Sequence, residues 1–129
     1  MNADERRSKL DEITKQVIGR IHVVSSTLGC GFVEKVYENA LVIELRANGL
    51  IVQQQHGLKV NYAGVTVGEF TTDLIVEESV LLELKAVKAL DEIHFAQCMN
   101  YLKASGLSVC LLVNFGKPRA EVRRIVLNY

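Results

Sequence analysis

The stretch TTDLIVEESVLLELKAV, residues 71–87, decides how this chain is expected to fold. Its two apolar segments, 74–76 and 80–87, are typical of buried β-strands. The three polar residues between them, 77–79, are few enough to reverse the chain as a hairpin. The stretch therefore predicts two neighbouring strands that run in opposite directions.

These two predicted strands carry three charged residues in an otherwise apolar setting. Side chains alternate across a strand, so Glu83 and Lys85 project from the same face. The hairpin would bring Asp73 close to Glu83. Ionised groups are costly to bury without a partner, and two neighbouring carboxylates require a cation. The charges therefore predict a metal-binding or catalytic site, or else a structural ion pair of Lys85 with one acid near a sheet edge.

Length and composition indicate a single globular domain over residues 1–129, with 49% hydrophobic and 23% charged residues. No apolar run approaches the roughly 20 residues that span a bilayer, and the charged N-terminus is no secretory signal. Cys30, Cys98 and Cys110 are widely spaced and odd in number, which favours a reduced, cytoplasmic protein. The sequence thus predicts a cytoplasmic domain that is not associated with a membrane.

Formal net charge is zero, which argues against a protein that coats nucleic acid by bulk electrostatics. A local basic stripe near the C-terminus remains a candidate surface for phosphate groups. A solvated, charged chain end is the alternative interpretation of the same residues. The stripe comprises Lys117, Arg119, Arg123 and Arg124.

Hydrophobic periodicity and turn signals predict an α/β fold. The helix over 4–25 carries an apolar stripe at three- and four-residue steps, and the strand over 107–115 is nearly all apolar and therefore central. The helix before that strand would make it parallel to a neighbour, so we expect a three-layer-like sandwich with a central mixed β-sheet flanked by helices. The expected helices cover 4–25, 32–47 and 90–105, and the expected strands cover 51–62, 65–76, 80–87, 107–115 and 122–128.

Two of the predicted helices carry further polar candidates. Glu34 falls in the first turn of the second helix, where the helix dipole favours negative charge, and Tyr37 follows one turn later. A Glu that satisfies the dipole and a core Tyr are the simpler interpretation. His94, Gln97 and Tyr101 share one face of the third helix, where they would either line a cleft or form a core contact.

Several of these fragments together resemble the GxxExxY protein family, a small branch of the PD-(D/E)XK nuclease-like superfamily. They are GFVEKVY at 31–37, Asp73, ELK at 83–85 and HFAQCMNYL at 94–102. The likeness runs from about residue 13 to residue 128, with the motifs in order. Thr72 replaces the proline that nominally precedes the aspartate. The resemblance implies a restriction-endonuclease-like core of helix, three strands, helix and strand.

The resemblance also implies a metal-dependent phosphodiesterase centre. Asp73 and Glu83 would offer carboxylate oxygens to Mg²⁺ or Mn²⁺, and the Leu84 carbonyl could complete the protein ligands. Lys85 would orient or help to deprotonate the attacking water. Glu34 would be an additional ligand or a nearby acceptor.

Other residues would bind the substrate in such a centre. Gln97 would contact the attacking water or the scissile phosphate. Candidates for further substrate contacts are Tyr37, His94, Lys117 and Arg119.

Three functions of different classes remain compatible with the sequence. The first is a metal-dependent nuclease acting on DNA or RNA, for which a two-fold homodimer would place two centres on two strands. The second is a non-catalytic nucleic-acid-binding or accessory module that keeps the nuclease-like fold. The third is a protein-interaction subunit that uses the apolar stripe of the first helix as its contact surface.

Overall fold

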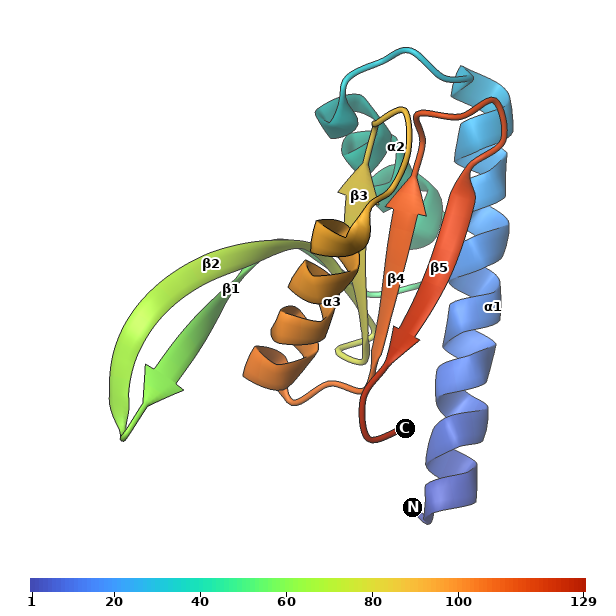
Figure 1. Cartoon of the computed structure of the whole chain (residues 1–129). Coiled ribbons are helices and arrows are strands. Elements are labelled where there is room, and N and C mark those ends of the chain that lie inside the picture. Colours follow the sequence, from blue (N-terminus) through green and yellow to red (C-terminus); the bar gives the residue numbers. More distant parts are fainter.

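The computed structural model describes all residues from 1 to 129, which form three helices and five strands (Figure 1). Each helix and strand predicted from the sequence is present, with ends displaced by a few residues. No helix combines the length and the apolar composition needed to cross a bilayer. In chain order the elements are α1 (Ala3–Leu28), α2 (Glu34–Ala47), β1 (Val52–Tyr62), β2 (Val65–Val76), β3 (Val80–Lys85), α3 (Glu92–Ser105), β4 (Val109–Asn114) and β5 (Glu121–Val126).

The strands form one mixed sheet in the order β1-β2-β3-β4-β5. Only β3 and β4 are parallel, because α3 returns the chain to the start of the next strand. The other neighbours pair antiparallel, and β5 lies at an edge. The mixed sheet, the parallel pair and the buried central β4 confirm the α/β fold expected from the sequence.

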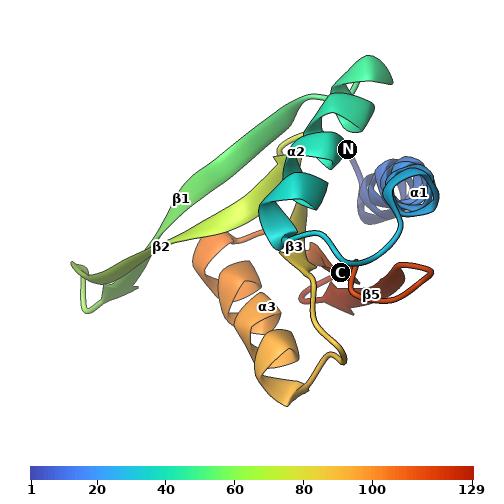
Figure 2. The ribbon, with the colours of Figure 1, turned by 90° about the horizontal axis from the view of Figure 1, so that it is seen from above.

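The two faces of the sheet bury separate apolar cores, with α1 and α2 over one face and α3 over the other (Figure 2). The apolar stripe of α1 is buried in the first core, so it is not a free surface for a protein partner. This finding removes the basis for the protein-interaction hypothesis. The second core contains the two buried cysteines, Cys98 and Cys110, which act there as small apolar residues.

The first two strands continue well beyond the rest of the sheet as a hairpin arm, residues 57–71 (Figure 1). Along the arm β1 and β2 pair only with each other, because β3 pairs with β2 no further than Leu74. Ala63 and Gly64 make the predicted turn at the tip, and both have positive φ values. Most arm residues between 59 and 69 are exposed to solvent.

The chain leaving β3 is held in place by the end of β4. The Asn114 side chain accepts a hydrogen bond from the Val87 N–H at 3.0 Å and donates one to the Val87 carbonyl at 2.9 Å. Gly116 packs so tightly there that an added Cβ would lie 2.2 Å from the Val87 carbonyl oxygen. These contacts fix the backbone two residues after Lys85.

Candidate active site

The structure brings Asp73 and Glu83 together at the point where β2 and β3 separate. The last backbone pair of the two strands is Leu74 with Leu82. Beyond it, side chains replace the backbone ladder: Glu83 Oε1 accepts from the Asp73 N–H at 3.2 Å, and Asp73 Oδ2 accepts from the Leu84 N–H at 2.7 Å. Glu83 is therefore anchored to the backbone of Asp73, and Asp73 to the backbone of Leu84, the residue after Glu83.

Thr72 adds a third hydrogen bond to this arrangement. Its hydroxyl is fully buried and donates to Glu83 Oε1 at 3.0 Å. A proline at this position, as in the nominal motif, could not make that bond. The departure from the motif therefore supplies a donor that helps to orient Glu83.

Both acids lie in surroundings that oppose their ionisation. Glu83 is 3% exposed, and burial, followed by the charge of Asp73, raises its pKa to about 7. Burial also raises the pKa of Asp73, although the hydrogen bond from the Leu84 N–H acts against it. Two ionised carboxylates would repel each other here, and a bound cation would offset that repulsion.

Lys85 ends β3 on the same strand as Glu83 and is partly exposed. Its positive charge acts to lower the pKa of Glu34, Asp73 and Glu83. No carboxylate oxygen lies within ion-pair distance of its ammonium group, since the six salt bridges of the chain all involve other residues. The structural ion pair considered from the sequence is thus not formed, and Lys85 remains free to act on another group.

Glu34 is the first residue of α2, and its side chain remains largely open to solvent. Partial burial and the charge of Asp73 raise its pKa, while Lys85 acts against both. Glu34 is therefore close enough for the charge of Asp73 to act on it. No three His, Cys, Asp or Glu side chains are arranged to hold one ion, so Asp73 and Glu83 form the compact pair and Glu34 stands apart.

Gln55 and Glu38, two residues that were not predicted from the sequence, form a hydrogen-bonded chain that ends at Asp73. Gln55 lies in β1 opposite Asp73, between the paired residues Gln54 and His56, and has φ 54°, a conformation unusual for a non-glycine residue. Its amide donates to Glu38 Oε1 at 3.0 Å and to Asp73 Oδ1 at 3.4 Å. Burial alone would raise the pKa of Glu38, but hydrogen bonds from Gln54, Lys35 and Gln55 outweigh it and lower the pKa.

A partial signal for Glu38 was present in the sequence. It follows Glu34 by one helical turn, so the two acids share a face of α2. Gln55 gave no comparable signal, because neither its positive φ nor its contacts follow from local sequence.

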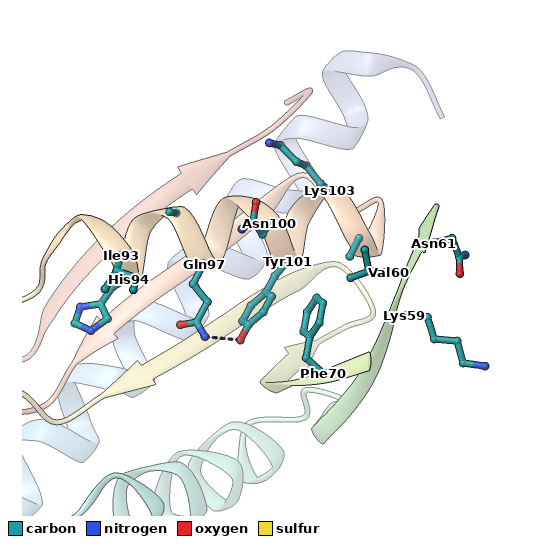
Figure 3. A pocket seen from close by; sticks show the side chains of 12 residues that line it. Lys59, Val60, Asn61, Phe70, Ile93, His94, Gln97, Asn100, Tyr101 and Lys103 are labelled. Carbon is teal, nitrogen blue, oxygen red and sulfur yellow. Dashed lines mark hydrogen bonds between the residues drawn. The ribbon is translucent and has the colours of Figure 1, made fainter. Parts of the chain in front are cut away.

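On the α3 side, Gln97 and Tyr101 form a polar pair one helical turn apart. The Gln97 amide donates to the Tyr101 hydroxyl at 2.7 Å, and the Tyr101 ring stacks on Phe70 of the arm at 4.6 Å (Figure 3). Burial, followed by the charges of Glu83 and Asp73, raises the pKa of Tyr101 to about 12. The charges of both acids therefore act on the Tyr101 hydroxyl that Gln97 contacts.

His94 and Tyr37 both have structural contacts. His94 Nδ1 accepts from the Asp91 N–H at 3.1 Å and so closes the capping box of α3. Its ring also lines a groove of about 1000 Å³ between α3 and the hairpin arm. Tyr37 is fully buried, and its hydroxyl donates to the Gly29 carbonyl at 2.6 Å and accepts from the Phe32 N–H at 3.2 Å. Tyr37 thus holds the loop that leads to Glu34 and has no surface left for a ligand.

The basic stripe near the C-terminus is largely neutralised by acids. Lys117 and Arg123 both pair with Glu121, and Arg124 pairs with Asp11 of α1. Arg119 is exposed in the β4–β5 loop and forms no salt bridge. As a continuous cationic surface the stripe is therefore weaker than its sequence indicates.

The donor atoms of the acid pair fit a hard divalent cation. Glu83 Oε1 accepts both protein hydrogen bonds, and no protein donor reaches Oε2. Asp73 Oδ2 accepts from the Leu84 N–H, while Oδ1 has only the longer contact from Gln55. Two carboxylates that each keep an oxygen available suit Mg²⁺ or Mn²⁺, which retain several waters beside one or two protein carboxylates.

An α/β domain with opposed acids and a lysine on diverging strands defines a recognisable class of protein. The model of the PD-(D/E)XK nuclease superfamily matches residues 11–125, so the chain belongs to that superfamily. No curated protein matches the chain.

Two solved structures share the fold. An alkaline exonuclease from Laribacter hongkongensis (LHK-Exo) aligns with a TM-score of 0.53 and 15% identity over 73% of this chain and 56% of its own. The protein SSO0001 aligns with a TM-score of 0.57 and 19% identity over 95% of this chain and 61% of its own. The chain thus corresponds to little more than half of each protein, and the likeness concerns the fold.

Proposed function

We propose that this protein is a metal-dependent nuclease that hydrolyses phosphodiester bonds of DNA or RNA. The opposed Asp73 and Glu83, each with an available oxygen, carry this proposal. Membership of the nuclease superfamily supports the class of reaction, and an exonuclease among the proteins of the same fold agrees with it.

In this proposal Asp73 and Glu83 hold Mg²⁺ or Mn²⁺, with the Leu84 carbonyl as a further ligand. A bound divalent ion would lower the pKa of a water molecule and offset charge on the phosphate oxygens. Lys85, which has no ion-pair partner, orients the attacking water, and its positive charge eases the loss of the water proton to solvent. The Gln55 amide keeps Asp73 in position through Oδ1.

Glu34 and Gln97 complete the proposed centre from two helices. Glu34 accepts a hydrogen bond from a water bound beside the acid pair, a role supported by the charge of Asp73, which contributes to raising the pKa of Glu34. Gln97, already oriented by Tyr101, donates to the scissile phosphate. We also propose placement in the GxxExxY branch, whose motif here supplies Glu34 and the loop-holding Tyr37, and a cytoplasmic location, which the three free cysteines favour.

The alternative is a nucleic-acid-binding module without catalysis. One observation favours it: no third acid joins Asp73 and Glu83 to hold one ion. In that case the network of Thr72, Glu83 and Asp73 would serve the fold alone, and the protein would bind neither Mg²⁺ nor Mn²⁺ through it.

Metal binding and cleavage separate the two functions. Isothermal titration with Mn²⁺ and Mg²⁺ should show saturable binding that Asp73→Ala removes, and labelled DNA and RNA should be cleaved only with metal. Lys85→Ala should retain metal binding and lose cleavage. Glu69→Ala, an exposed acid of the arm, is the matched control and should behave as wild type. Unfolding of both Asp73→Ala and Glu83→Ala would instead assign the acids to a structural network.

A further inference from the structure

The loops that leave β3 and β4 lie at the same end of the sheet, because these two strands are parallel (Figure 1). Residues 86–90 form the β3 loop, and residues 115–120 form the β4 loop. The Phe115 N–H donates to the Lys85 carbonyl at 2.8 Å, at the point where both loops begin. Since Lys85 belongs to the candidate active site, both loops start directly beside that site.

The backbones of the two loops are held in place by contacts along their length. Gly116 of the β4 loop packs against the backbone of Val87 in the β3 loop so closely that no side chain would fit between them. At the far end of the β4 loop, the Ala120 N–H donates to the Ser25 hydroxyl of α1 at 2.9 Å. The ring of Pro118 restricts the backbone between these two contacts. The loops therefore present their side chains from an ordered backbone.

The side chains of the two loops are basic, although the formal net charge of the chain is zero. The loops contain Lys88, Lys117 and Arg119 and no Asp or Glu. Lys117 pairs with Glu121 at 3.5 Å, whereas Lys88 and Arg119 are exposed and take part in no salt bridge. Asp91, the next acid after the β3 loop, uses its carboxylate to cap α3. Two cations therefore stay available to an anionic ligand.

These two cations suit the phosphates of a polynucleotide. The guanidinium group of arginine can donate to a phosphate through two parallel hydrogen bonds, and the ammonium group of lysine acts as a compact positive charge. Exposed cations on neighbouring loops match a long polyanion, because each can meet a different phosphate of the same strand. A phospholipid surface also carries phosphates. The position of the loops beside the acid pair favours the polynucleotide.

We propose that Lys88 and Arg119 bind phosphates of a DNA or RNA strand on one side of the phosphate that is cut. The place of the cut rests on the proposed function, whereas the binding does not. Contacts to phosphates hold the strand without reading its base sequence. A dinucleotide has no phosphate beyond the one that is cut, so it should be a poor substrate compared with a longer strand.

The test measures binding in the absence of catalysis. Fluorescence anisotropy would follow a short labelled thymidine oligonucleotide and its uridine RNA counterpart in buffer containing a metal chelator. The variant is Lys88→Ala with Arg119→Ala. The control is Lys9→Ala with Lys15→Ala, which removes the same charge from exposed positions on α1. Vesicles of phosphatidylglycerol, which present phosphates on a lipid surface, serve as a competitor.

Loss of two phosphate contacts should reduce the slope of log affinity against log salt by about 1.4, since each contact to a single strand contributes about 0.7. If the affinities are equal at about 1 M salt, this slope corresponds to roughly 25-fold weaker binding at about 0.1 M. The control should bind within about twofold of wild type. Arg119→Lys should keep the wild-type slope, because it retains the positive charge.

Three results would overturn the proposal. The first is no binding of either oligonucleotide to the wild type. The second is an equal loss of affinity in the variant and the control. The third is displacement of the oligonucleotides by vesicles at the same phosphate concentration, which would assign the loops to a lipid surface.

Cleavage assays separate failure of this proposal from failure of the proposed function. With Mn²⁺ or Mg²⁺ the double variant of Lys88 and Arg119 should raise KM more than it lowers kcat, because it removes contacts away from the reacting phosphate. Metal-dependent cleavage with an unchanged KM refutes the role of the loops alone. Binding that depends on the loops, without cleavage under either metal, refutes the nuclease alone.

Discussion

Glu83→Gln should stabilise the metal-free protein, and the effect should depend on pH. Glu83 is almost fully buried with a pKa near 7, compared with an ordinary value of 4.5 for glutamate. Since each unit of difference corresponds to about 1.4 kcal/mol, ionising Glu83 in the folded state costs about 3 kcal/mol. A glutamine amide removes that cost and keeps an oxygen to accept from Thr72 and the Asp73 N–H.

The direction of this pH dependence follows from the protonation of Glu83 in the folded and the unfolded chain. Between pH 4.5 and about 7 the unfolded chain releases the Glu83 proton while the folded protein keeps it. Wild-type stability from this group is therefore fully present below pH 4.5, falls as pH rises, and is lost above pH 7. The variant should match wild type near pH 4 and exceed it by about 3 kcal/mol at pH 8.

Urea titration and thermal melting in a chelating buffer would measure the effect across this range. For a domain of this size about 3 kcal/mol corresponds to roughly 12 °C in Tm. Glu69→Gln, at an exposed arm position, is the control and should change Tm little at any pH. A Glu83→Gln variant that is no more stable than wild type at pH 8, or equally stabilised at pH 4, would refute the reasoning.

Three further predictions address the same region and the core. The Mn²⁺ affinity of the wild type should fall about tenfold for each pH unit below 7, because the metal must displace the Glu83 proton. Metal titrations at several pH values would measure this dependence. An affinity that does not change with pH would exclude Glu83 as a ligand. Gln55→Ala should lower the free energy of unfolding by about 1 kcal/mol, because Glu38 and Asp73 lose a donor, whereas Gln53→Ala, on the same strand, should cost less. Thr14→Val should stabilise the protein by about 1 kcal/mol, because the buried Thr14 hydroxyl has no hydrogen-bond partner. Urea unfolding would measure the effect, and a midpoint at or below that of wild type would contradict the prediction.

The fold could be predicted because its signals are local. The apolar stripe of α1 has the helical period, and the apolar runs of β3 and β4 are typical of strands that are buried on both faces. The pairing of Asp73 with Glu83 followed from the short turn between their strands.

The parts that could not be predicted depend on distant contacts. Gln55, which donates to Asp73, has a positive φ although it is not a glycine, and no local pattern indicates that conformation. The basic stripe was overestimated for the same reason, since Arg124 meets an acid more than a hundred residues earlier in the chain, Asp11. The groove likewise requires the arm and α3 to lie side by side, and nothing in either segment alone reveals that.

The hairpin arm divides the molecule into parts of unequal rigidity. An isolated two-stranded ribbon is marginally stable, and along the arm β1 and β2 have only each other as partners. Amide hydrogens near its tip should therefore exchange with solvent far faster than those of the buried β4. Because Asp73 lies at the base of the arm, where three strands meet, the tip of the arm can bend while the acids stay fixed.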